Sequence, residues 1–204
     1  MLTSDPKSNS RREVLAILGG AAIVPLVPGS AFAMSTKEAT TMIETVVREI
    51  MSAVNSGQSE ARILAQFKTI FLRYADVPII ARSVLGAPWR TATDAQKQAF
   101  VSAFQDYLAD KYGRRFHAYE GATVTVTRAS DQGDKGILVN STVKSASSAP
   151  FAVDWQVSDR GGSKKLINIF IEGISMLSTE RSEIRAMLEA KRNSVDGLIA
   201  TLKG

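Results

Sequence analysis

The chain has 204 residues, 45% of them hydrophobic, and this length allows one domain with a sizeable core. It carries a formal net charge of +5 and no cysteine, so disulfide bonds are excluded and stability must come from burial. The mildly basic charge suits contact with an anionic membrane surface, and the absence of a lysine-rich block argues against a nucleic-acid partner.

The first 33 residues have the pattern of an export signal. Arg11 and Arg12 precede an apolar run over residues 16–27, and a small-x-small cleavage site follows the run. The run is too short for a membrane span, which needs about 20 residues. The paired arginines favour twin-arginine export, with an ordinary secretory signal as the alternative. We therefore expect cleavage after residue 33, leaving residues 34–204 as a single domain.

Three long amphipathic helices are expected in the first half of the exported chain, because apolar residues recur there at helical spacing. The apolar stripes cover residues 39–54, 63–74 and 99–112. Ser35 with Glu38, and Thr93 with Gln96, form capping-box patterns at the starts of the first and third of these helices.

A short capped helix is expected between the second and third long helices. Asp76 and Pro78 suit its first turn, and Gly86 and Pro88 end it before Trp89. The segment offers neither a metal-ligand cluster nor a phosphate-binding loop, so it indicates the wall of a pocket rather than a catalytic loop.

After Gly121 the period of the apolar residues changes from 3.6 to 2, which indicates β-strands. Four strands are expected, around residues 124–126, 139–143, 151–157 and 166–171. The fourth is apolar on both faces apart from Asn168, so we expect it to be a central strand that is covered on both sides.

Two helices are expected to follow the strands, at about residues 178–191 and 193–202, with Asn193 or Ser194 as the cap of the second. Helices, then strands, then helices predict an α+β fold in which helices pack on one face of a twisted four-stranded antiparallel sheet.

Candidate catalytic groups are sparse. His117 lacks the neighbours of a metal site or a catalytic triad and is expected to be a solvated residue at a helix end. Glu172 interrupts an apolar strand, and we expect its carboxylate to bond backbone amides or an arginine such as Arg82 or Arg181.

Helix-on-sheet folds of this size include small-molecule enzymes of the NTF2-like isomerase or dehydratase type, which need an acid or base directed into the interior. Asp154, Asn168 and Tyr107 are the candidates, although Asp154 alternates with the apolar residues of its strand. Two functions stay open as alternatives to the one inferred below. The first is an enzyme of this type, and the second is a lipid-free periplasmic interaction module.

Two separated motifs carry a family resemblance. The first is D-x-x-x-I-A-R-x-V-L-G-x-x-W-R, from Asp76 to Arg90, followed by Phe100 and Phe104. The second is I-E-G-I-S at residues 171–175, followed by Arg181 and by V-D-G-L-I at residues 195–199. Together they resemble the MlaC family of periplasmic phospholipid-binding proteins, also called toluene-tolerance proteins.

The resemblance implies a periplasmic carrier, not an enzyme, that moves phospholipid between the outer and inner membranes and so maintains outer-membrane lipid asymmetry. It implies an apolar cavity between helices and sheet, with phospholipid as cargo and no further cofactor or metal. The implied partners are an inner-membrane ABC-type transporter complex and an outer-membrane lipoprotein–porin complex, with transient membrane contact and a monomeric carrier. Asn168 stands where family members often have aspartate, which leaves room for a different cargo such as a hopanoid-type lipid.

The residues predicted to contact lipid are aromatic and aliphatic side chains that can face a common interior. They are Phe67, Phe71, Val84, Leu85, Trp89, Phe100, Phe104, Tyr107, Leu108, Tyr112, Phe151 and Trp155. Three basic residues, Lys111, Arg114 and Arg115, are predicted to meet a headgroup or the membrane surface. An ordinary filled core would give the same apolar pattern, so only the resemblance favours a lipid site.

Overall fold

The structure is a computed structural model that describes residues 34–114, 119–146 and 148–204. The predicted export signal over residues 1–33 and the predicted site residue Arg115 lie outside the described residues, as does His117.

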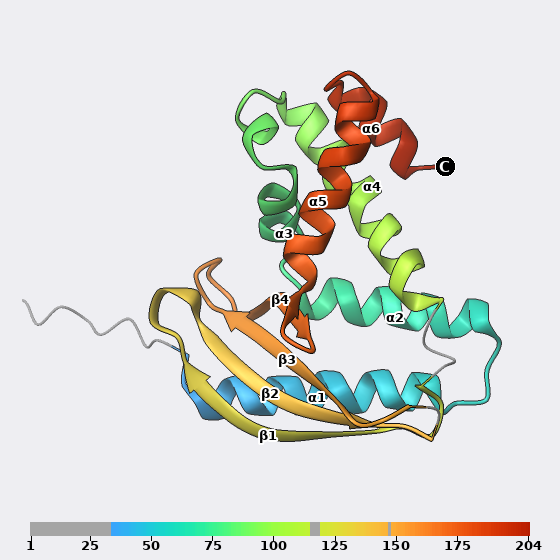
Figure 1. The fold of residues 1–204 in the computed structure, drawn as a ribbon, viewed down its shortest axis with the longest axis vertical. Coiled ribbons are helices and arrows are strands. Elements are labelled where there is room, and N and C mark those ends of the chain that lie inside the picture. Colours follow the sequence, from blue (N-terminus) through green and yellow to red (C-terminus); the bar gives the residue numbers. More distant parts are fainter. Residues whose placement is uncertain (1–33, 115–118, 147) are drawn as a thin grey trace, which may run out of the picture. The chain divides into compact units, whose positions relative to one another are not determined.

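Helices form at both ends of the described chain, as the sequence indicates (Figure 1). Their bounds are α1 Thr36–Val54, α2 Glu60–Tyr74, α3 Val77–Leu85, α4 Asp94–Gly113, α5 Met176–Ala190 and α6 Val195–Leu202, with a 3₁₀ turn η1 at Ala87–Arg90. Both predicted capping boxes are present, on α1 and α4. Asp76 caps α3 through Ile79 N, and Ser194 caps α6 through Gly197 N.

The strands form one antiparallel sheet in the order β1-β2-β3-β4-β5, which confirms the α+β fold class. Their bounds are β1 Thr123–Asp131, β2 Ile137–Lys144, β3 Phe151–Ser158, β4 Lys165–Ile171 and β5 Ile174–Ser175, with a short 3₁₀ turn η3 at Gly133–Lys135. The fifth strand was not predicted, because two residues are too few to show a period.

The position expected for the fourth strand was wrong. Strand β4 is the last long strand of the sheet, and its outer neighbour β5 pairs only with Phe170 and Ile171. Helices α3 and α5 contact this strand in addition to its sheet neighbours, so its apolar residues do not require a central position in the sheet.

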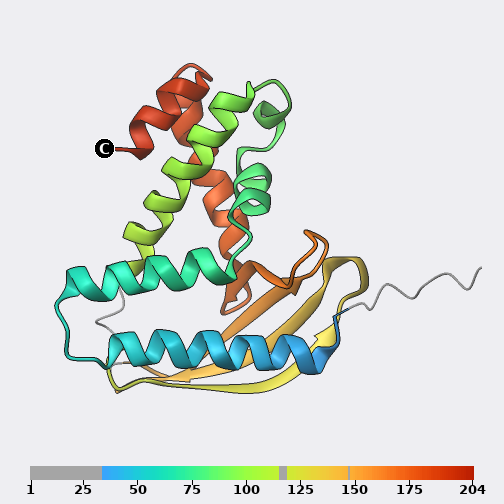
Figure 2. The same cartoon turned by 180° about the vertical axis from the view of Figure 1, so that it is seen from behind.

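The described helices pack in two groups. Helix α1 lies along β1 and β2 with α2 beside it, whereas α3 to α6 contact one another (Figures 1 and 2). Two apolar cores result. One joins α1 to the sheet and includes Ile43, Val139 and Val157, and the other joins α3 to α6 and includes Phe100 and Phe104. No helix within the described ranges is long and apolar enough to cross a membrane.

Candidate functional site: an apolar cavity between two cores

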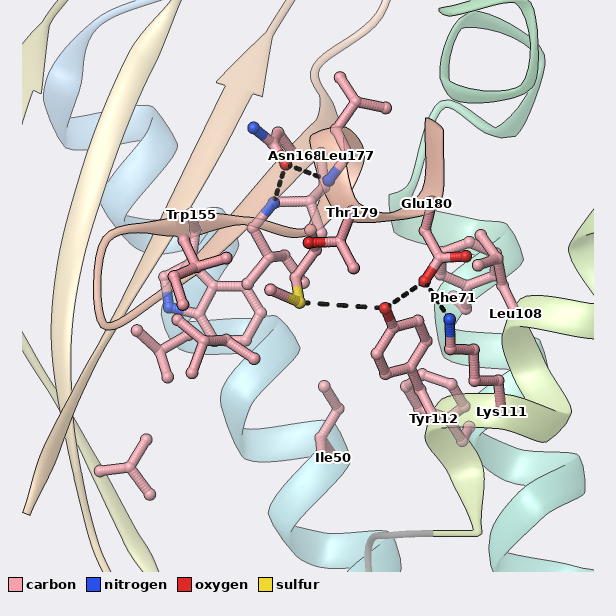
Figure 3. A pocket seen from close by; sticks show the side chains of 18 of the residues that line it. Ile50, Phe71, Leu108, Lys111, Tyr112, Trp155, Asn168, Leu177, Thr179 and Glu180 are labelled. Carbon is pink, nitrogen blue, oxygen red and sulfur yellow. Dashed lines mark hydrogen bonds and ion pairs between the residues drawn. The ribbon is translucent and has the colours of Figure 1, made fainter. Parts of the chain in front are cut away.

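A partly open cavity of about 600 Å³ lies where the two cores meet. Its walls come from α1, α2, α3, α4, α5 and the sheet (Figure 3). Most of the lining is aliphatic or aromatic, and a few polar side chains lie at one side. The apolar lining residues include Ile50, Met51, Phe67, Phe71, Leu108, Val124, Val143, Phe151, Val153, Trp155, Ile169 and Leu177. The volume and composition are typical of a small-molecule or lipid site.

The helical period places the aromatic residues of α2 on this cavity. Phe67 and Phe71 are one helical turn apart, so they point the same way, and their rings stack with centroids 6.2 Å apart. Opposite them, the period of two along β3 directs Phe151, Val153 and Trp155 to the same face of the sheet. The cavity is therefore bounded by aromatic side chains from two layers.

Seven of the predicted site residues line the cavity. They are Phe67, Phe71, Leu108, Lys111, Tyr112, Phe151 and Trp155. Their contact with lipid stays a prediction, but the structure brings them together from α2, α4 and β3.

Seven other predicted residues do not line the cavity. Val84, Leu85, Phe100 and Phe104 are buried in the core of α3 to α6, and Trp89 and Tyr107 pack against that core. The seventh, Arg114, is exposed at the C-terminal end of α4. The stripe on α4 is continuous in sequence, but its first turns face α3 and α6 and only its last turn reaches the cavity.

Sequence reasoning missed the contributions of α1, the outer strands and α5. Ile50 and Met51 of α1 and Val124 of β1 were not among the residues predicted to contact lipid, yet they line the cavity. Glu180 was missed entirely. Its signal was present, because Glu180 interrupts the apolar stripe of α5 between Leu177 and Ile184.

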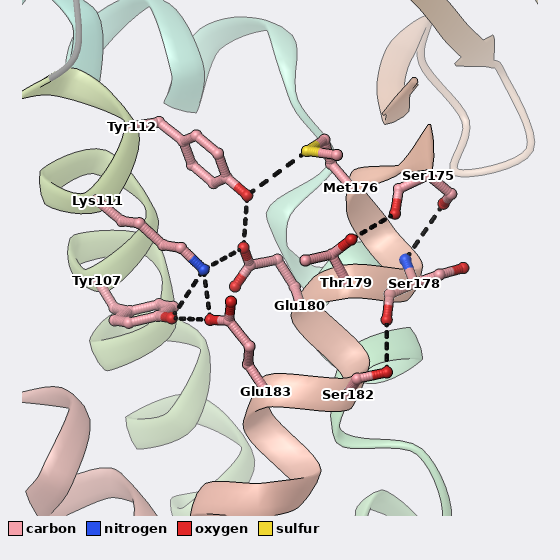
Figure 4. Close-up of polar contacts among 10 residues, drawn as sticks. All are labelled: Tyr107, Lys111, Tyr112, Ser175, Met176, Ser178, Thr179, Glu180, Ser182 and Glu183. Atoms are coloured by element: carbon pink, nitrogen blue, oxygen red, sulfur yellow. Dashed lines mark hydrogen bonds and ion pairs between the residues drawn. The ribbon is translucent and has the colours of Figure 1, made fainter. Parts of the chain in front are cut away.

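The polar side of the cavity is a network that links α4 to α5 (Figure 4). Lys111 Nζ donates to Glu180 Oε1 at 2.7 Å and also pairs with Glu183. Tyr112 donates to the same Glu180 oxygen. Tyr107 donates to Glu183 Oε2 at 2.8 Å and accepts from Lys111 at 3.2 Å. The ammonium of Lys111 thus meets two carboxylates of the protein itself.

The network also sets the protonation of its members. Burial raises the pKa of Tyr107 to about 12, and burial followed by the bond to Glu180 raises the pKa of Tyr112 well above its usual value. Burial disfavours the charged form of Lys111, but the bonds from Glu180, Glu183 and Tyr107 together outweigh it and raise the pKa of Lys111. Both tyrosines are therefore neutral donors at neutral pH, and Lys111 is a cation.

Asn168 lines the cavity from β4, but its side chain is used to hold local structure. Its Oδ1 accepts from Ile169 N at 2.9 Å and from Leu177 N at 3.0 Å, and its Nδ2 donates to Ser175 Oγ at 3.0 Å. The residue fixes the start of α5 against β4. Asp154, another candidate acid, accepts a bond from Asn140 at 2.8 Å.

Glu172 bonds the backbone rather than an arginine. Its carboxylate accepts from Ala152 N, and its own N–H donates to Ala152 O at 3.0 Å. Arg181 instead donates to Ser83 O and Oγ, both at 2.9 Å. Glu172 adopts a φ of 49°, so this contact holds a strained turn between β4 and β5. Among the described residues, no cluster of histidine, aspartate and glutamate could hold a metal ion.

The fold and the cavity together define a helix-on-sheet protein with an apolar pocket. The family model described as MlaC protein matches residues 44–204, and the chain therefore belongs to the MlaC family, as predicted.

Two of the proteins that are similar to this chain illustrate the match. The toluene tolerance protein ttg2D of Pseudomonas putida is 26% identical over 125 residues, which are 61% of this chain and only 58% of that relative. A phospholipid-binding protein from Ralstonia solanacearum, solved in complex with a phospholipid, matches with a TM-score of 0.70. That match covers 80% of this chain and 94% of the other at 22% identity, so it establishes the fold.

Proposed function

We propose that this protein is a periplasmic carrier that holds a phospholipid in the cavity between its two cores and moves it between the membranes of a Gram-negative envelope. The observation that carries the proposal is the apolar cavity of about 600 Å³. It lies within the range of roughly 300–1,000 Å³ typical of ligand pockets. The phospholipid bound to the Ralstonia solanacearum protein, which shares the fold, supports the same class of ligand here.

The energetics of hydrocarbon transfer favour a carrier. Burying roughly 30 methylenes at about 0.8 kcal/mol each stabilises a lipid by about 24 kcal/mol relative to water. A bare lipid therefore crosses an aqueous space at a negligible rate. A bilayer offers its tails the same environment as the cavity, so exchange between membrane and carrier can lie close to thermal balance.

The direction of transport must come from partners, because the chain holds no nucleotide-binding motif. We propose an inner-membrane ABC-type transporter complex and an outer-membrane lipoprotein–porin complex as those partners, with the carrier acting as a monomer. Maintenance of outer-membrane lipid asymmetry is the biological role that follows. The candidate groups for catalysis favour binding over an enzyme, because Asn168 holds backbone amides and Tyr107 is bonded to Glu183.

Lipid extraction tests the proposal. The protein is purified from its native envelope without detergent, and its bound molecules are extracted into organic solvent. Mass spectrometry then identifies the extracted molecules and measures their molar ratio to protein. Phospholipid at about one molecule per chain is expected. A small polar metabolite at that ratio would support an enzyme instead, and an empty extract would support the lipid-free interaction module.

A further inference from the structure

Met34, the first residue that the structure describes, is part of the folded core. Its side chain belongs to the apolar core that joins α1 to the sheet, and the residue is only 6% exposed. Its backbone N donates to Asp159 Oδ2 at 2.9 Å, a contact between residues 125 positions apart in the chain. Asp159 is partly exposed in the turn between β3 and β4. This hydrogen bond therefore links the start of α1 to that turn.

Met34 is also the residue that would become the first of the chain if the export signal is cleaved where the sequence predicts, after residue 33. In the uncleaved chain its nitrogen belongs to a neutral amide with one N–H. Cleavage converts that nitrogen into an α-amino group, whose ordinary pKa of about 7.7–8.0 leaves it mostly charged at neutral pH. A hydrogen bond between charged groups is roughly twice as strong as one between neutral groups.

The surroundings of Met34 favour a carboxylate beside a charged terminus. Ser35 is the N-cap of α1, so Met34 lies just before the positive end of the helix dipole, where a cation is disfavoured. The nearby Glu38 is already bonded to Lys164 and to Ser35, and these bonds lower its pKa to about 2. Asp159 is the carboxylate that directly contacts the Met34 nitrogen, so it would neutralise the new positive charge.

We propose that removal of the leader creates an ion pair between the α-ammonium of Met34 and the carboxylate of Asp159. Hydrolysis adds water across the Ala33–Met34 peptide bond, which gives a carboxylate on the released leader and the ammonium on Met34. Because α1 and β3 both line the cavity, the ion pair links two of its walls in the processed protein alone. The inference rests on the predicted export signal and is independent of lipid binding.

Chemical labelling of amino groups tests the proposal on the processed protein. The protein is produced with its own leader and purified from the envelope, and its intact mass identifies the first residue. A limiting amount of acetic anhydride at neutral pH then acetylates amines, and peptide mass spectrometry compares the α-amino group of Met34 with the lysines. The reagent attacks only the neutral amine, whereas the contact with a carboxylate favours the ammonium.

We expect the α-amino group of Met34 to react at least about tenfold more slowly in the folded protein than in the same protein unfolded in urea. A hydrogen bond between charged groups is worth about that factor. A first residue other than Met34, or equal reactivity in the folded and unfolded protein, would overturn the inference.

A substitution separates the ion pair from protection by burial. Asp159→Asn keeps the size of the side chain and removes its charge, so Met34 should react about fivefold faster, as expected for a partly exposed ion pair. Asp134→Asn is the control. It removes an exposed carboxylate that pairs with Arg160, and labelling of Met34 should stay slow. Equal labelling of Met34 in the wild-type protein and in Asp159→Asn would show that no ion pair forms.

Salt provides a second measurement that needs no variant, in case Asp159→Asn does not fold. In about 1 M sodium chloride the Debye length falls to about 3 Å, which weakens a partly exposed ion pair. Labelling of Met34 in the wild-type protein should then become severalfold faster. A rate that salt leaves unchanged would assign the protection to burial and contradict the ion pair.

Discussion

The indole nitrogen of Trp155 donates a 3.0 Å hydrogen bond to Ser141 Oγ on the neighbouring strand. Ser141 in turn donates to Val153 O at 2.6 Å, and both Ser141 and Trp155 are buried. This pair satisfies the polar end of the largest side chain in the cavity wall. The indole ring is thereby held in place while its apolar surface faces the cavity.

Removal of the serine hydroxyl should destabilise the fold. Ser141→Ala leaves the buried Trp155 N–H without its acceptor, which costs about 1–3 kcal/mol. We expect that loss in the free energy of unfolding, measured by urea denaturation. Ser182→Ala, which removes an exposed hydroxyl from α5, is the control and should change stability by less than about 0.5 kcal/mol. Equal effects of the two substitutions would show that the bond to Trp155 contributes nothing.

A larger side chain at Ile50 should reduce lipid binding. Ile50 is partly exposed and lines the cavity from α1, so Ile50→Trp extends into the open volume (Figure 3). Excluding two methylenes of a tail would cost about 1.6 kcal/mol and weaken binding about tenfold. The ratio of copurified lipid to protein measures the effect. Ile79→Trp adds the same bulk at an exposed site outside the cavity lining, and its lipid content should not change. Normal lipid content in Ile50→Trp would place the ligand elsewhere.

Loss of the Lys111 charge should be far more costly than loss of a surface charge. Lys111→Met leaves Glu180 buried without its cation, and breaking a buried ion pair in this way costs about 3 kcal/mol or more. Lys68 pairs with Asp106 at the surface, with both side chains about half exposed, so Lys68→Met should cost less than about 1 kcal/mol. Urea denaturation of the two variants measures the difference. Similar losses would contradict the buried character of the Lys111–Glu180 pair.

Stability should decline at alkaline pH in a defined window. The pKa of Tyr107 is raised from 10.0 to about 12 in the folded protein, and the pKa values of Tyr112 and Lys111 are raised too. Between pH 10 and 12 the folded state therefore binds more protons than the unfolded state, so stability falls as pH rises. Below about pH 10 the contribution of these raised pKa values to stability is fully present. The midpoint of urea denaturation, measured from pH 8 to 12, checks the window. Replacing Tyr107 and Tyr112 together by phenylalanine should flatten the decline, and an unchanged slope would assign it to other groups.

Much of the fold could be predicted because local signals agreed with the final packing. Ser35 and Thr93 cap the helices where the sequence placed them, and Ser194 is one of the two caps that it allowed for the last helix. The change of apolar period after Gly121 located the strands. The position of β4 in the sheet order could not be predicted. Apolar residues on both faces show that a strand is covered, but they do not show which elements cover it.

The cavity was harder to predict than the fold. Apolar periodicity identifies the buried side of a helix, but it does not distinguish a filled core from a cavity wall. Phe104 and Leu108 therefore looked equivalent, and both belong to the core of α3 to α6, but only Leu108 also lines the cavity. Glu180 could have been found, since a carboxylate on the apolar stripe of a helix requires a buried partner. Its link to Lys111 spans 69 residues and needed the structure.

The two tryptophans of the chain test most directly whether hydrocarbon occupies the cavity. Trp155 lines it, whereas Trp89 packs against the separate core of α3 to α6. Trp89→Phe leaves only Trp155 fluorescent, and Trp155→Phe leaves only Trp89. Each variant is loaded from vesicles of phospholipid carrying bromine on the acyl chains, which quenches indole fluorescence at close range. We predict strong quenching of Trp155 and little of Trp89. Equal quenching of both, or quenching of Trp89 alone, would contradict a lipid tail in this cavity.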